Sequence, residues 1–141
     1  MSAIQGLERP APVASKLTKP FWDACNEGRL VLQNCTACAR LHYPPAEKCS
    51  KCGSADKWEW KEVKGKGHID VFFVIRDSRI KGFRSAQPIN FAVITLDEDP
   101  GINFLSNLPG RQPGEVPVGA AVEVMFEKTS NGQAIPEWRV A

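Results

Sequence analysis

Two Cys-x-x-Cys pairs constrain the fold of this chain more than any other feature. They begin at Cys35 and at Cys49, read Cys-Thr-Ala-Cys and Cys-Ser-Lys-Cys, and leave ten residues between them. A tight turn lets both sulfurs of one pair face a single ion, and a second pair completes a shell of four thiolates. The spacer is shorter than the commonest one, but it accommodates a small hairpin that returns the second pair to the first. The sequence therefore predicts a metal site made by Cys35, Cys38, Cys49 and Cys52.

Zinc suits a closed shell of four sulfurs best, because it needs no redox partner and stabilises units too small to have their own core. Iron is the chemical alternative, since geometry alone does not separate the two metals. Two disulfides are the other alternative. No secretory signal opens the sequence, so we expect a cytoplasmic protein whose thiols stay reduced. Four thiolates leave no position for water or substrate, so the predicted zinc is structural rather than catalytic.

The totals narrow the class of protein. A length of 141 residues is enough for one domain or two small modules. We find no apolar run long enough to span a bilayer, so no membrane association is expected. The net charge of +2 argues against a nucleic-acid binder driven by bulk electrostatics. The fifth cysteine, Cys25, is expected to be a partly buried structural thiol.

A short helix is predicted over residues 18–27, before the cysteines. Thr18 is expected to cap it, Pro20 suits its first turn, and Gly28 is a plausible stop. Phe21 and Trp22 at its start either pack on the rest of this chain, which we favour slightly, or anchor the helix to another protein.

Strands are predicted for most of the remaining chain. Alternation of apolar and polar residues indicates a strand at 29–34, before the first cysteine pair. His42, between the pairs, is expected to be a surface or ring-stacking residue, since four cysteines are available for the metal. About five strands over some eighty residues, without a helix between them, favour a small closed barrel of the OB type. The predicted strands after the cysteines are 58–63, 67–75, 89–96, 102–105, 121–126 and 135–140.

Several further motifs follow one another in a characteristic order. They are Phe21-Trp22, the run from Leu30 to Cys35, Cys38, Tyr43-Pro44-Pro45, Cys49, Cys52-Gly53, Gly65-Lys66-Gly67, and the run from Val118 to Val122. Over residues 18–140 this order resembles the OB-fold, acyl-CoA-associated zinc-ribbon family, once catalogued only as a domain of unknown function. Ala39 departs from the pattern, because a glycine is common there, and slight strain is expected in the first cysteine turn.

The resemblance implies a mainly β protein with an N-terminal helix, a rubredoxin-like zinc ribbon and a C-terminal OB-fold barrel. We expect an arm at 1–17, the helix and ribbon at 18–57 and the OB-fold domain at 58–141. Members of this family accompany thiolase-like proteins, and some accompany an acyltransferase or a hydratase. The implied function is that of an accessory, non-catalytic subunit in a thiolase or aldolase complex that degrades a coenzyme A thioester. The implied assembly is a heterotetramer or larger, in which this chain stabilises its partner and helps to form the acyl-CoA site.

A cationic loop offers a place for coenzyme A. Cations and an aromatic ring suit the phosphates and adenine of this ligand, although the same set also suits a nucleic-acid strand or a plain solvated face. Gly82 is the flexible point of this loop, which we expect to be mobile. The candidate coenzyme A residues are Arg76, Arg79, Lys81, Phe83 and Arg84.

Two other functions compete with that of an accessory subunit. A zinc-ribbon and OB-fold nucleic-acid-binding protein is the alternative, disfavoured by the near-neutral charge and by the scarcity of aromatic pairs expected at the surface. A free-standing enzyme is disfavoured because the sequence offers no Ser-His-Asp or Cys-His arrangement and no open metal site. His42 and His68 are the only two histidines.

Overall fold

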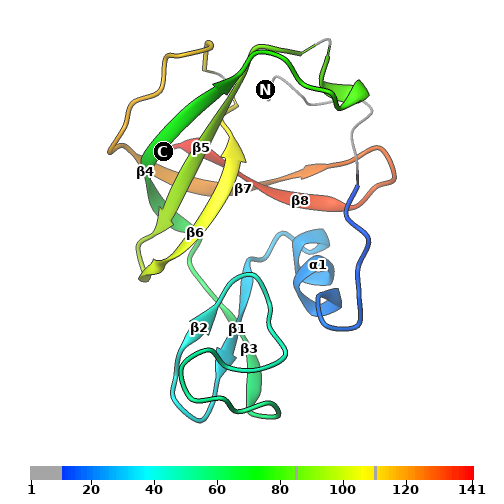
Figure 1. Cartoon of the computed structure of the whole chain (residues 1–141), viewed down its shortest axis with the longest axis vertical. Coiled ribbons are helices and arrows are strands. Elements are labelled where there is room, and N and C mark those ends of the chain that lie inside the picture. The colour runs from blue at the N-terminus through cyan, green and yellow to red at the C-terminus, as the bar shows by residue number, and fades with distance from the viewer. Residues whose placement is uncertain (1–10, 85, 110) are drawn as a thin grey trace.

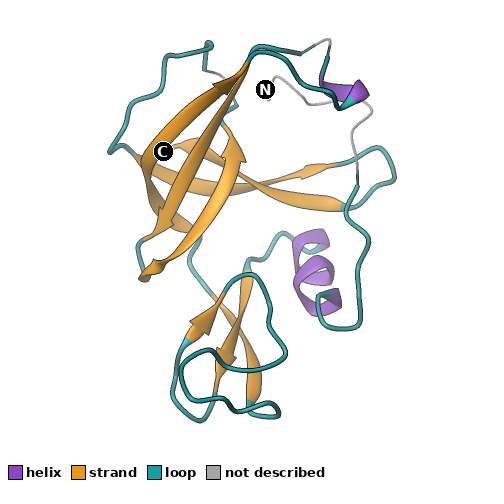
Figure 2. Cartoon of the chain, in the orientation of Figure 1, coloured by secondary structure: helices purple, strands orange, loops and turns teal. Residues whose placement is uncertain are grey.

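The chain forms a small ribbon and a larger curled sheet with one helix beside them (Figure 1). A computed structural model describes residues 11–84, 86–109 and 111–141. Figure 2 shows that strands dominate this part of the chain. The elements are α1 (Lys19–Asn26), β1 (Val31–Cys35), β2 (Leu41–His42), β3 (Trp58–Glu62), β4 (Lys66–Ile75), the 3-10 helix η1 (Lys81–Phe83), β5 (Ile89–Leu96), β6 (Asp99–Asn107), β7 (Ala121–Lys128) and β8 (Ala134–Val140).

The ribbon is a three-stranded antiparallel sheet in the order β2-β1-β3. Every residue of β1 is buried, so the alternating pattern at 29–34 does not produce an exposed face. Trp58 pairs with Cys35 and Glu62 with Val31. The strand at 58–63, which the sequence analysis grouped with the OB-fold domain, is therefore hydrogen-bonded within the ribbon. It returns the chain from the cysteine turns to the larger sheet.

The larger sheet has five strands in the order β6-β5-β4-β7-β8. This is the connectivity of an OB fold, in which the first strand pairs with both the second and the fourth, and the predicted fold class is confirmed. Strand β5 begins and ends where its apolar run predicts, and its interior position agrees with apolar residues on both of its faces. Gly67 lets β4 and β5 come close, because a Cβ there would lie 2.5 Å from the carbonyl oxygen of Thr95.

The barrel is curled but not closed by a backbone ladder. Among the described residues, no ladder joins the edge strands β6 and β8. Side chains connect them instead, chiefly Ser106 on β6 and Glu137 on β8. The expectation of a fully closed barrel is therefore met only through these side chains.

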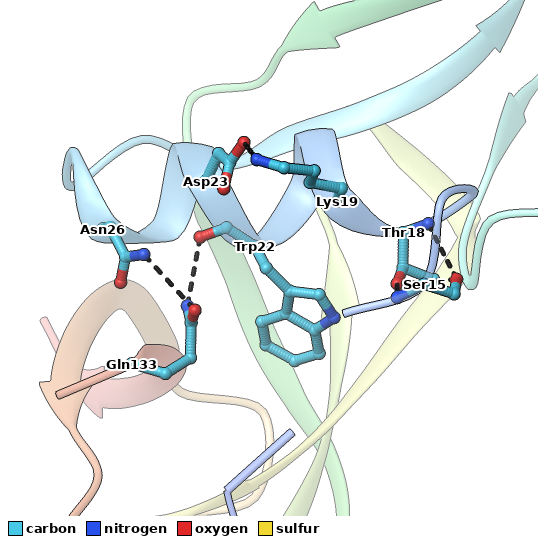
Figure 3. Close-up of polar contacts among 7 residues, drawn as sticks. All are labelled: Ser15, Thr18, Lys19, Trp22, Asp23, Asn26 and Gln133. Atoms are coloured by element: carbon cyan, nitrogen blue, oxygen red, sulfur yellow. Dashed lines mark hydrogen bonds and ion pairs between the residues drawn. The ribbon is translucent and has the colours of Figure 1, made fainter. Parts of the chain in front are cut away.

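Helix α1 links the ribbon to the far end of the chain. It buries Phe21, Ala24 and Cys25, the spacing of one helical face, and Gly28 follows it with φ of +74°. Thr18 is the N-cap residue, but its side chain makes no capping hydrogen bond, and that part of the prediction is wrong. Its Oγ1 accepts a bond from the backbone N–H of Ser15 instead, at 2.9 Å (Figure 3).

The same helix is held by the turn between β7 and β8, which lies at the lower left of Figure 3, below α1. The amide of Gln133 donates to the carbonyl oxygen of Trp22 at 3.1 Å. The backbone N–H of Ala134 donates to Oδ1 of Asn26 at 2.8 Å. Helix and hairpin are thus joined although more than a hundred residues separate them.

A chain of aromatic contacts connects the ribbon to the barrel interior. Ring centroids lie 5.6 Å apart for Phe21 and Tyr43, 4.3 Å for Tyr43 and Phe104, and 5.2 Å for Phe104 and Trp138. Phe21 is therefore part of the core, as the favoured interpretation predicted, and Trp22 packs against the core half-buried. These contacts give ribbon and sheet one shared core.

Within the described residues, no helix is both long enough and apolar enough to cross a membrane. Most of the arm predicted at 1–17 lies outside the described residues, since these begin at residue 11.

Candidate functional site

Two similar turns carry the four cysteines. In the first, the backbone N–H of Ala39 donates to the carbonyl oxygen of Cys35 at 2.7 Å, and in the second that of Gly53 donates to Cys49 at 2.9 Å. Both donors have left-handed backbones, with φ of +60° at Ala39 and +77° at Gly53. Ala39 is the only non-glycine residue of the described chain with positive φ. The strain expected at this position is therefore present.

The turns bring all four sulfur atoms together. The ligand atoms of Cys35, Cys38, Cys49 and Cys52 all lie within 4.8 Å of one another. The Cys35–Cys52 sulfurs are 3.6 Å apart and the Cys38–Cys49 sulfurs 3.5 Å apart. A tetrahedral zinc with bonds of about 2.3 Å needs sulfurs about 3.8 Å apart, so this arrangement fits the ion closely. All four cysteines are free thiols, and the disulfide alternative has no support in this geometry.

Hydrogen bonds around the second turn favour thiolates. Ser54 lowers the pKa of the Cys52 thiol to about 6, first through its hydroxyl, 3.4 Å from the sulfur, and then through its backbone. At Cys49, burial raises the thiol pKa, but the backbone amides of Lys51 and Cys52 outweigh it and the net pKa is lowered. Metal binding requires deprotonated sulfur, so the lowered pKa values of Cys49 and Cys52 favour binding of the ion.

His42 lies inside this site and not at the surface. It is 7% exposed, and its Nε2 atom is 3.3 Å from Sγ of Cys49. The Trp58 ring stands perpendicular to the imidazole with centroids 5.0 Å apart. The ring-stacking expectation is met in this edge-on form, whereas the surface alternative is wrong. Burial, and secondarily the charge of Arg40, lowers the pKa of His42.

Gln33 fastens the segment between the two turns to the middle strand of the ribbon. Its amide nitrogen donates to the carbonyl oxygen of Ala46 at 3.0 Å, and its amide oxygen accepts from the N–H of the same residue at 2.8 Å. Gln33 is only 2% exposed. This paired bond replaces missing ladder contacts beyond the two-residue strand β2, and sequence analysis gave no signal for it.

The five candidate coenzyme A residues lie on the loop between β4 and β5, at the opposite end of the molecule from the ribbon (Figure 1). The four cations are exposed, and Phe83 is half-buried in η1. In the part of the chain that is described, no carboxylate lies within ion-pair distance of these cations. The backbone N–H of Ser78 donates to Oε1 of Gln87 at 2.8 Å, which braces the two sides of the loop.

Next to this loop, the outer face of the large sheet is apolar and exposed. Val71, Val93 and Leu105 form one row across β4, β5 and β6, and Phe73 with Phe91 forms part of the next. Exposed fractions are 51% for Val71, 44% for Phe73 and 60% for Leu105. The Phe73 and Phe91 rings stack at 5.8 Å and 12°. Few exposed aromatic pairs were expected from the sequence, and this one is not visible there because strand register alone brings the two rings together.

The second histidine lies away from the cysteines. Nδ1 of His68 is 3.4 Å from Oδ1 of Asp97, and both side chains are about half exposed. An exposed imidazole–carboxylate pair of this kind is an ordinary surface contact.

A four-cysteine ribbon followed by a curled five-stranded sheet defines a zinc-ribbon protein with an OB-fold domain. Comparisons with known families agree. Residues 22–59 match the model of the ChsH2 rubredoxin-like zinc ribbon domain, and residues 60–127 match that of the ChsH2 C-terminal OB-fold domain. The chain belongs to the ChsH2 family. The zinc ribbon match and the four converging cysteines together support a structural zinc ion.

Three relatives extend the comparison. A curated protein of Thermomonospora curvata, described as a probable enoyl-CoA hydratase alpha subunit, is 29% identical over 133 residues. The match covers 94% of this chain but 40% of that protein, so the chain spans less than half of the relative's length. A chain from a structure titled "Ltp2-ChsH2(DUF35) aldolase" matches with a TM-score of 0.80 and 27% identity, over 92% of this chain and 98% of that one.

The third relative supports the fold alone. It is a Sulfolobus solfataricus protein of unknown function from the DUF35 family. Its TM-score is 0.61 at 20% identity, and the match covers 91% of this chain and 87% of that chain. The ribbon and the OB fold therefore persist together at low sequence identity.

Proposed function

We propose that this chain is an accessory subunit of a complex that acts on a coenzyme A thioester. In such a complex a thiolase-like partner carries the catalytic groups. The reaction of that partner is a thiolase or a retro-aldol reaction in a degradative pathway. The chain stabilises the partner and completes the acyl-CoA site. Two relatives support this proposal by their names, one an aldolase of two named components and the other a subunit of a probable enoyl-CoA hydratase.

The observation that carries the proposal is the exposed apolar face of β4, β5 and β6. Three of the most exposed large apolar side chains in the described residues, Val71, Phe73 and Leu105, lie on it. Exposed apolar patches of this kind mark interaction sites, because leaving them in water costs about 25 cal/mol per Å². We propose that the face receives the partner subunit, and that the loop carrying Arg76, Arg79, Lys81, Phe83 and Arg84 then reaches the phosphates of coenzyme A.

We also propose that Cys35, Cys38, Cys49 and Cys52 hold one zinc ion whose role is structural. All four positions of a tetrahedron are then filled by sulfur, and no position is open for chemistry. The ion would shape the ribbon while the partner performs the reaction.

The interface is tested by substitutions on the face with a matched control outside it. Leu105→Glu and Val71→Glu place a charge at the proposed contact, whereas Val118→Glu places one on a loop at a side chain that is 58% exposed. Each chain is tagged and purified from its native cells, and the bound protein is identified by mass spectrometry. We expect the unchanged chain and Val118→Glu to retain a thiolase-like protein and the other two to lose it. Retention by all variants, or a folded chain that acts on acyl-CoA alone, would contradict the proposal.

The loop is tested by titrating the purified complex with coenzyme A. We expect Arg76→Ala and Arg84→Ala to weaken binding about tenfold each, as loss of a phosphate contact does, and Lys128→Ala to leave it unchanged. Equal affinities would remove these residues from the ligand site.

The Phe73–Phe91 stack, in which Phe73 is exposed and Phe91 half-buried, also favours a second candidate, because aromatic rings on an OB sheet bind bases of single strands. Fluorescence anisotropy with a labelled single-stranded oligonucleotide at low and high salt decides between the accessory subunit and a nucleic-acid-binding protein. Tight, strongly salt-dependent binding, lost with Phe73→Ala, would favour the nucleic-acid function.

A further inference from the structure

We infer that His42 belongs to the metal centre as an outer hydrogen-bond donor to the sulfur of Cys49, a positioning residue and not a fifth ligand. The inference rests on the proposed binding of one metal ion by the four cysteines. It adds a residue outside the two cysteine turns to that site.

The position of the imidazole carries the inference. Its Nε2 atom lies 3.3 Å from Sγ of Cys49, a distance suited to an N–H···S hydrogen bond. The side chain is 7% exposed, so water has little access to this contact. A metal-bound thiolate has no proton and can only accept a hydrogen bond. The imidazole must therefore carry its proton on Nε2.

Two neighbours hold the ring in place. The edge-on ring of Trp58 lies 5.0 Å from the imidazole centroid, and His42 itself pairs with Gln33 across the ribbon. Cys49 is thereby tied to strand β2 as well as to its own turn. A buried donor at a ligand sulfur orients that ligand and draws electron density away from the metal.

The most direct test uses the unchanged protein loaded with ¹¹³Cd in place of zinc. Nitrogen chemical shifts of the imidazole should report a proton on Nε2, and that proton should show scalar coupling to the cadmium through the sulfur of Cys49. A bare Nε2, or a one-bond coupling between that nitrogen and the metal, would overturn the inference. Failure of the protein to bind cadmium at all would instead overturn the proposed metal site, and the inference with it.

Variants separate the hydrogen bond from packing. His42→Leu keeps an apolar side chain of similar bulk without a donor, His42→Gln keeps an N–H donor, and His68→Leu is the control at the exposed histidine. We expect His42→Leu to release zinc to a chromogenic chelator 10–100-fold faster, with His42→Gln and the control close to the unchanged protein. In the iron-loaded protein, His42→Leu should also lower the Fe(III)/Fe(II) potential, because the sulfur then donates more electron density.

Three results would contradict this role. The first is an unchanged rate of zinc release and an unchanged iron potential in His42→Leu. The second is an equal effect of His42→Leu and His42→Gln on zinc release. The third is an effect of His68→Leu on zinc release as large as that of His42→Leu. If His42→Leu does not fold, the Gln replacement and the cadmium coupling still decide the question.

Discussion

The hydroxyl of Ser106 donates to Oε2 of Glu137 at 2.8 Å and joins the two edge strands of the curled sheet. The same oxygen of Glu137 accepts the backbone N–H of Asn107 at 3.1 Å. Oγ of Ser106 in turn accepts the backbone N–H of Trp138 at 2.8 Å. Side chains therefore satisfy backbone groups that a ladder would otherwise pair, in a region where Ser106 is 1% exposed.

Ser106→Ala should lower the free energy of unfolding by about 1–3 kcal/mol, since it leaves a buried amide and a buried carboxylate without this partner. Urea denaturation followed by tryptophan fluorescence measures the change. Ser130→Ala, at an exposed serine of the β7–β8 turn, is the control and should change stability by less than about 0.5 kcal/mol. Equal losses of unfolding free energy in the two variants would show that Ser106 does not contribute to closure of the barrel.

Ala39→Gly should stabilise the protein by about 0.5–1 kcal/mol, because glycine adopts a φ of +60° without steric cost. The gain is measured as a shift of the denaturation midpoint in the zinc-loaded protein. Ala37→Gly, an exposed alanine in the same turn, should not stabilise, since φ there is not positive. A stabilisation of both variants would point to a cause other than the left-handed backbone.

Gly67→Ala should destabilise the protein by about 2–3 kcal/mol, because the new Cβ would lie 2.5 Å from the carbonyl oxygen of Thr95 in the neighbouring strand. The backbone of the neighbouring strand cannot move aside as a flexible side chain can. Gly101→Ala offers a matched comparison, since its Cβ would meet only the carboxylate of Asp99, at 3.2 Å. Thermal denaturation of both variants should show the larger loss for Gly67→Ala, and the reverse order would refute this account.

Removing the metal should unfold the ribbon. Its three short strands share a core with the barrel but have little of their own, so the ion is expected to supply several kcal/mol of folding energy. We expect Cys38→Ser or chelation to lower the midpoint of thermal unfolding by roughly 10 °C or more. Cys25→Ala is the control, since it removes a cysteine outside the cluster and should keep one metal per chain, measured by mass spectrometry. A metal-free protein with unchanged stability would contradict a structural role.

Stability should fall above pH 9, partly because of Cys25. Burial raises the pKa of its thiol from 9.0 to about 12, so the folded chain keeps a proton that the unfolded chain loses. This contribution to stability is complete below pH 9 and declines as the pH rises toward 12, by up to about 1.4 kcal/mol per pH unit. Burial raises the pKa of Tyr43 in the same direction, to about 12, with its effect beginning near pH 10. The free energy of unfolding of Cys25→Ala and of the unchanged chain, compared between pH 8 and pH 10, isolates the contribution of the Cys25 thiol. Parallel curves of stability against pH would refute this contribution.

Local patterns in the sequence predicted much of this structure. Cysteine spacing identified the four sulfurs, a continuous apolar run identified β5, and the family pattern, in which a glycine is common at position 39, predicted strained backbone at Ala39. These features depend on residues near one another in the chain, which is why the sequence reveals them.

Features that depend on distant residues were not predicted. Trp58 belongs to the ribbon because it pairs with Cys35, and His42 is buried next to the perpendicular Trp58 ring. Register between β4 and β5 stacks Phe73 on Phe91 at the surface.

One local contact was not predicted either. Thr18 bonds to Ser15 before its helix rather than to the first turn of the helix. Two short polar side chains compete here for the same backbone groups, and helix propensity does not resolve that competition.

The attachment of α1 to the β7–β8 hairpin has a consequence for synthesis. The hydrogen bond between Asn26 and Ala134 spans 108 residues, so the helix emerges from the ribosome long before its binding site exists. The helix stays undocked from this hairpin during that interval, and docking must close a loop of 108 residues, which slows folding. A nascent chain halted before residue 133 should therefore depend on chaperones that shield this undocked helix, and a chain whose β7–β8 hairpin has left the ribosome should not.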